Sequence, residues 1–108
     1  STARPTGRRR ARVSSDDAGP LVDRIAAAVL AADGVGDLHA GVLGEVGTYL
    51  PGRRVPGIRL DGEACEVHVT ALFGARLADV VEAVRSAVRP LVSGPVHVVV
   101  EDVVRSPA

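Results

Sequence analysis

The chain has 108 residues and no formal net charge at pH 7, and 46% of its residues are hydrophobic. This length suits one domain with an ordinary core. One tyrosine, one phenylalanine and no tryptophan exclude an aromatic platform for single-stranded nucleic acid. No run approaches the ~20 apolar residues of a transmembrane helix. A single cysteine cannot form an internal disulfide, which fits a reducing compartment. We therefore expect a soluble, cytoplasmic protein.

Charge is unevenly distributed along the chain. Residues 1–15 carry five arginines and no acidic residue, whereas the remainder has eight arginines against 13 acidic residues, a net charge of −5. An acidic body argues against nucleic-acid binding by the domain itself. Residues 1–18 have little to bury, so they are predicted to form a disordered tail, with the domain at 19–104 and a short disordered end at 105–108. The tail can attract anionic partners or simply solvate the chain, and we favour the second interpretation for Arg8, Arg9, Arg10 and Arg12.

The first half of the domain begins with a helix. Apolar residues at helical spacing predict this helix over about 20–32, with Pro20 in its first turn and Gly34 as its cap. Residues 37–42 read as a strand, and 46–50 as either a short strand or a turn. Pro and Gly mark 51–54 as a loop, and strand pairing is expected only after Pro56, which has no N–H to donate.

The second half reads as strand, helix, strand. Asp61-Gly62 is a hairpin signal that joins a strand at 58–60 to an alternating strand at 64–73. A helix follows over about 76–90, and an alternating strand begins at Val96. The predicted fold is a single α+β domain of order α-β-β-α-β, with a three- to four-stranded mixed sheet and both helices on one face. The helix has an apolar stripe formed by Leu77, Val80, Val81, Val84, Val88 and Leu91.

Strand parity divides the sheet into two faces. The helix side is predicted to hold Cys65, Val67, Val69, Ala71 and Phe73, so Cys65 is interpreted as a core residue and not as a nucleophile. The open side is predicted to hold His68, Thr70, Leu72, His97, Val99, Glu101 and Val103.

The histidines are the remaining candidates for chemistry. His39, His68 and His97 are scattered and lack the close ligand spacing of a zinc site. Glu66 and His68 can converge with His97 and Glu101 if their strands are adjacent, but solvated sheet-face residues are the favoured interpretation. We therefore assign no catalytic residue, no metal site and no cofactor. The half-apolar open face suggests a contact surface instead. We hypothesise that this face, or the edge beside it, mediates self-association through Leu72, His97, Val99 and Val103.

The order of these signals resembles the alkaline shock protein family of bacterial envelope stress proteins. The resemblance covers about residues 19–104 and departs from the family pattern at 41–54 and in the Arg-rich tail. It rests on a first helix followed by Gly34-Val35, a strand that closes in Phe73-Gly74, a Val-striped helix, a Ser93-Gly94 turn and a Val-rich last strand.

The resemblance implies a non-enzymatic structural or adaptor protein in envelope stress response or envelope homeostasis. Such proteins associate with a small integral membrane anchor protein and with paralogues, at the cytoplasmic face of the membrane. A homo-oligomer and peripheral membrane association are compatible with this role. The alternative is a small RNA- or DNA-binding module that uses the Arg-rich tail. The acidic body and the lack of aromatic residues argue against nucleic acid as the partner.

Overall fold

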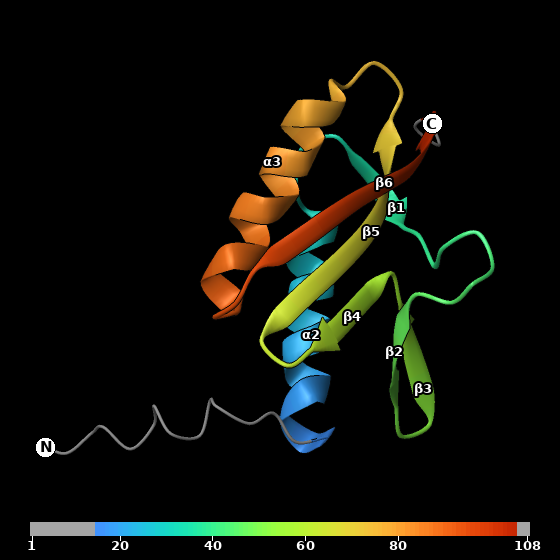
Figure 1. The fold of residues 1–108 in the computed structure, drawn as a ribbon. Helices are drawn as coiled ribbons and strands as arrows, with labels where there is room; N and C mark the ends of the chain where they lie inside the picture. The colour runs from blue at the N-terminus through green and yellow to red at the C-terminus, as the bar shows by residue number, and fades with distance from the viewer. Residues whose placement is uncertain (1–14, 106–108) are drawn as a thin grey trace, which may run out of the picture.

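The computed structural model describes residues 15–105 as two helices packed against one side of a mixed β-sheet (Figure 1). The predicted α+β class is confirmed. The helices are α2 (Ser15–Leu30) and α3 (Leu77–Val88), and a short 3-10 helix, η1 (Arg89–Leu91), extends α3. The strands are β1 (Val35–Leu38), β2 (Gly47–Leu50), β3 (Arg53–Pro56), β4 (Ile58–Asp61), β5 (Ala64–Leu72) and β6 (Val96–Val104).

β5 is the central strand of the four-stranded sheet. It pairs in parallel with β6 along one edge and antiparallel with β4 and β1 along the other. β4 covers the first half of that edge and β1 the second, and His68 lies between them. The backbone N–H of His68 donates to the Gly57 carbonyl, and its own carbonyl accepts from the His39 N–H, at 2.8 and 2.9 Å. Gly57 has a φ of 84°, which glycine adopts without strain.

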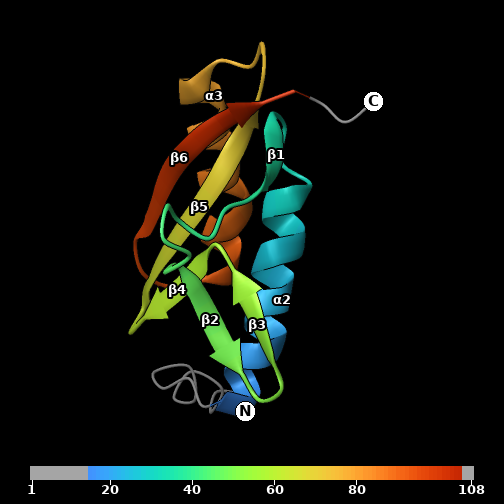
Figure 2. The same ribbon diagram turned by 90° about the vertical axis from the view of Figure 1, so that its right-hand side faces the viewer.

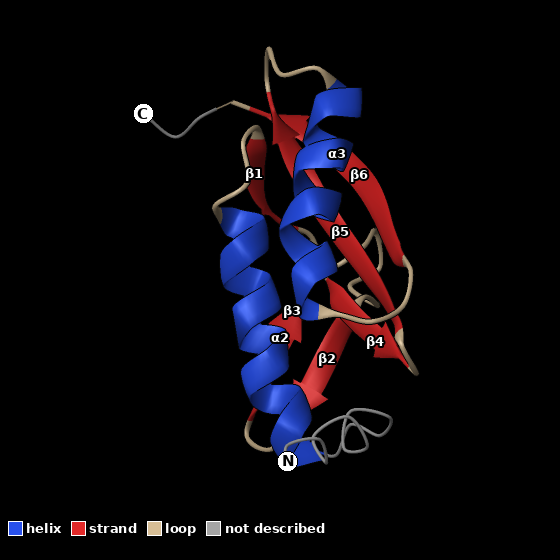
Figure 3. Ribbon diagram, turned by 90° about the vertical axis from the view of Figure 1, so that its left-hand side faces the viewer, coloured by secondary structure: helices blue, strands red, loops and turns tan. Residues whose placement is uncertain are grey.

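Both helices lie side by side on the same face of the sheet (Figure 3). The core between helices and sheet is almost wholly aliphatic, because β-branched side chains alternate inward along the strands. The predicted stripe of α3 is confirmed at Val80, Val84 and Val88, which are buried, while Leu77 at its start is half exposed. Fully buried residues from the other elements complete the core: Val22, Ile25, Val29, Ile58, Cys65, Val67, Val69 and Ala71.

The first helix begins earlier than predicted. α2 starts at Ser15, so residues 15–18 are helical and do not belong to the tail. Pro20 lies inside the helix, where its missing N–H removes only the bond to the carbonyl of residue 16. The helix also ends at Leu30, two residues earlier than predicted, so Gly34 is not its cap. With a φ of 83°, Gly34 lies instead in the following turn, where the Val35 N–H donates to the Ala32 carbonyl. The predicted tail arginines lie outside the described residues.

The middle of the chain forms a second, two-stranded sheet. β2 lies where the sequence allowed a short strand or a turn, whereas β3 begins inside the segment predicted as a loop. β2 and β3 pair antiparallel as a tight hairpin, with Pro51 and Gly52 at its turn and Gly52 at a φ of 78°. Pairing begins before Pro56, contrary to the prediction, because Pro56 is the last residue of β3 and its missing N–H costs no internal ladder bond. Arg53 ties this hairpin to α2 by a paired contact with Asp23, with N–O distances of 3.0 and 2.8 Å. The predicted hairpin around Asp61-Gly62 is confirmed by β4 and β5.

Candidate functional site

The face of the sheet opposite the helices carries the candidate functional residues. The two helices occupy the other side, and the loop after β1 crosses this face over β5 (Figure 2). The pairing register places Arg59, Glu66 and His97 in one row across the strands, and His68 opposite Val99 in the next. Residues that pair directly across a sheet share a face, so these side chains are neighbours on the open side.

His68 is the centre of a polar cluster on this face. Only 7% of the residue is exposed, although it lies on the side without helices. Its Nε2 lies 2.6 Å from Glu66 Oε2, and its Nδ1 lies 2.6 Å from Glu101 Oε2. A neutral imidazole has one N–H and cannot donate to both carboxylates. Both contacts are hydrogen bonds at once only when the ring or one of the carboxyl groups carries an additional proton.

Two further groups tie this cluster to the loop beside it. Arg59 Nη1 donates to Glu66 Oε1 at 3.2 Å, and Arg59 Nη2 donates to the Glu45 carbonyl at 3.2 Å. The hydrogen bond with His68 lowers the pKa of Glu66 most strongly, and the positive charge of Arg59 lowers it further, against a partial burial that raises it. The side chains of Arg59, Glu66 and His68 thus hydrogen-bond to one another or to the backbone, and these bonds hold them in place.

Three of the four residues that the sequence allowed to converge do so. Glu66, His68 and Glu101 meet, whereas His97 stays exposed beside them. The favoured interpretation of solvated side chains is therefore wrong for His68. Sequence reasoning missed Arg59 and Glu45. The Asp61-Gly62 turn was the available signal for Arg59, because a tight hairpin there sets Arg59 opposite Glu66.

The pairing at the end of β6 shows that one predicted site residue lies on the other face of the sheet. Glu101 is an extra residue in a β-bulge, because Val100 pairs with Val69 and Asp102 with Thr70. A bulge reverses the alternation that follows it. Val103, predicted on the open face, therefore pairs with Ala71 on the helix side, and Val104 joins the open face instead. Val103 is still 46% exposed because β6 is an edge strand.

The other predicted contact residues lie where parity placed them. Val99 is on the open face and 38% exposed, and Leu72 is half-buried at the far end of β5. Phe73 differs from its prediction, because β5 ends at Leu72 and the ring turns outward. It is 65% exposed and lies under the guanidinium of Arg105, whose carbon is 4.4 Å from the ring centre.

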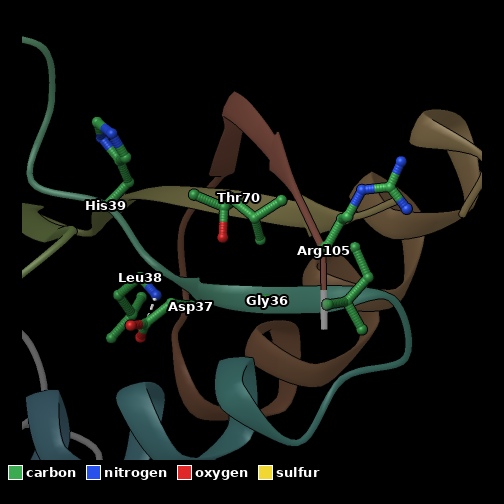
Figure 4. A pocket seen from close by; sticks show the side chains of 8 residues that line it. Gly36, Asp37, Leu38, His39, Thr70 and Arg105 are labelled. Atoms are coloured by element: carbon green, nitrogen blue, oxygen red, sulfur yellow. Dashed lines mark hydrogen bonds between the residues drawn. The ribbon is translucent and has the colours of Figure 1, made fainter. Parts of the chain in front are cut away.

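A shallow hollow of about 390 Å³ opens at the Leu72 end of this face (Figure 4). Gly36 of β1 forms part of its wall, where an added Cβ would lie 2.7 Å from Thr70 Oγ1 and 2.8 Å from Val104 Cγ2. Thr70 Oγ1 is buried there and has no hydrogen-bond partner among the described residues. The remaining lining residues are Asp37, Leu38, His39, Leu72 and Arg105.

The remaining candidates for chemistry are the Cys65 thiol and the side chains that could bind a metal ion. Burial first, and then the negative charge of Glu66, raise the pKa of the Cys65 thiol to about 11, so the thiol stays protonated at neutral pH. Cys65 is fully buried beneath the helices, as predicted. Residues 15–105 include no group of three or more His, Cys, Asp or Glu placed to hold a metal ion. Within the same range, no helix is long and apolar enough to cross a membrane.

Comparisons with protein-family models, with curated proteins and with solved structures found no match to this chain.

Proposed function

We propose that the protein acts without catalysis, as an adaptor in envelope stress response or envelope homeostasis that binds other proteins at the cytoplasmic face of the membrane. The observation that carries the proposal is the open face of the sheet. Leu72 and Val99 offer apolar contact area there, and the polar groups between them are held by one another. A half-apolar surface whose polar groups bond to one another suits protein binding.

The resemblance to alkaline shock proteins supports the identity of the partners. By that resemblance they are a small integral membrane anchor protein and paralogues of this chain. The net charge of the chain after residue 15 is −5, which favours protein partners over nucleic acid. The Arg-rich tail would add a weak, salt-sensitive attraction to anionic lipid.

Site-specific photo-crosslinking in the native cell tests this proposal. A photoreactive residue at Leu72 should give adducts with an integral membrane protein. The same residue at Leu77, half exposed at the start of α3 on the helix side, serves as the control and should not. Adducts with RNA would favour the nucleic-acid alternative. Equal membrane-protein adducts from both positions, or none from Leu72, would contradict the adaptor proposal.

A further inference from the structure

The outer edge of β6 is an unpaired strand edge in the part of the chain that the structure describes. β6 pairs with β5 on one side, and no second strand lies along its other side (Figure 1). The Pro95 carbonyl accepts from the Cys65 N–H, which fixes the ladder so that His97 and Val99 bond toward β5. The alternate residues Val98 and Val100 therefore direct their backbone N–H and C=O groups outward.

The two ends of this edge are closed. Arg85 Nε donates to the Val96 carbonyl at 3.3 Å, and the Val103 N–H donates to Asp102 Oδ1 at 2.8 Å. The bulge at Glu101 bends the strand between them. The free window is thus short and runs over 97–101. It contains no lysine or proline, and the bulge at Glu101, which is another feature that protects strand edges, lies at its last residue.

We propose that this window pairs with the same window of a second copy of the chain, antiparallel about a two-fold axis at Val99. This inference rests on the proposed association-based function and names the surface that the protein uses to bind itself. Val98 then exchanges backbone hydrogen bonds with Val100 of the second copy, and Val100 with its Val98, about four bonds in all. The closed ends limit the pairing to one partner and one register.

The side chains of the window are complementary in this register. Val99 meets Val99 of the second copy across the axis, and β-branched pairs stabilise sheets. His97 lies opposite Glu101, whose Oε2 is bonded to His68, so the other oxygen of this carboxylate faces the imidazole and no like charges meet. If one strand moves by two residues relative to the other, His97 lies opposite Val99 and the pairing of His97 with Glu101 is lost. The sequence of the window is therefore self-complementary only in the antiparallel arrangement centred on Val99.

The resulting dimer has a continuous sheet with both open faces on the same side. A two-fold axis through the edge and perpendicular to the sheet keeps both helical layers on the other side. The pair of open faces doubles the surface available to a membrane-anchored partner. Because the window is short, its area falls well below the ~800 Å² per partner of a standard interface, so the dimer is weak and dependent on concentration.

Amide hydrogen exchange at increasing protein concentration tests this pairing residue by residue. The amides of Val98 and Val100 should slow by at least about tenfold as dimer forms, since they gain bonds only in the dimer. The amides of His97 and Val99 bond to β5 in either state and serve as internal controls. Val99→Glu places two like charges at the axis and should raise the dimer dissociation constant about tenfold. Val42→Glu is the matched control, because Val42 is 84% exposed on the loop after β1 and lies outside the window.

A dimer that leaves the Val98 and Val100 amides unprotected would assign association to another surface and overturn the proposal. A chain that stays monomeric at every concentration would overturn it as well. Either result leaves the crosslinking at Leu72 unaffected. Conversely, the absence of a membrane-protein adduct at Leu72 would contradict the adaptor function without changing the amide exchange of Val98 and Val100.

Discussion

The two sides of one sheet differ in how their residues are held. On the helix side, Val67 and Val69 are fully buried and packed by aliphatic neighbours. On the open side, His68 is almost as buried, but hydrogen bonds to Glu66 and Glu101 hold it. Packing on the helix side provides most of the stability. The polar cluster on the open side fixes the shape of a surface that we propose for binding.

Truncation of a core residue should produce the largest effect on the helix side. Ile58→Ala removes a fully buried side chain that lies opposite Val67, and should lower the free energy of unfolding by about 2–5 kcal/mol. Leu72→Ala on the open side is the comparison, and it should cost less than about 1.5 kcal/mol because Leu72 is only half-buried. Urea titrations measure both. Equal losses of unfolding free energy in the two variants would mean that both sides of the sheet contribute equally to stability.

Removal of the central histidine should show how strongly the open side depends on its polar cluster. His68→Ala leaves two carboxylates facing each other without the ring, and should cost about 1–3 kcal/mol in unfolding free energy. His97→Ala is the matched control, on the same face one strand away, and should change stability by less than about 0.5 kcal/mol because His97 is exposed. A similar loss in both variants would show that the cluster has no special role.

A smaller effect should appear on acidification. The folded-state pKa of Glu66 lies below its ordinary 4.5, chiefly because His68 bonds the carboxylate. A lowered pKa means that the ionised form favours folding, so this contribution is present above about pH 4.5 and is lost as the pH falls through the lower folded-state value. Glu66→Gln should flatten this part of the stability curve, measured by urea titration between pH 3 and pH 6. An unchanged slope in the variant would contradict the role assigned to Glu66.

Alternation in the sequence predicted the helix side well. The odd-numbered residues from Cys65 to Ala71 are all fully buried on the helix side, and the core stripe of α3 follows helical spacing. These features depend on local periodicity, which is visible in the residues themselves. The turn at Asp61-Gly62 was predicted for the same reason. The hairpin turn at Pro51-Gly52 carried a comparable signal that was interpreted as a loop.

The contacts on the open side depend on structural features that the periodicity of the sequence does not reveal. The bulge at Glu101 moved Val103 to the helix side and brought the Glu101 carboxylate to His68. Nothing in the local sequence marks a bulge without glycine. The burial of His68 also required that β5 and β6 lie side by side, and that the backbone of His68 hydrogen-bond with the Gly57 carbonyl and the His39 N–H. These contacts join segments far apart in the chain. Parity alone could identify the face but not its contacts.

The most direct test of this account compares one substitution on the two sides of the sheet. Val69→Glu buries a charge beneath the helices and should abolish cooperative unfolding at 25 °C. Val99→Glu should leave the free energy of unfolding within about 0.5 kcal/mol of the parent chain. At a concentration where the parent chain dimerises, it should lower the sedimentation coefficient toward that of a monomer. Two results would contradict the division between a stabilising side and a binding side. One is a Val99→Glu chain as destabilised as Val69→Glu, and the other is a Val99→Glu chain that sediments like the parent chain.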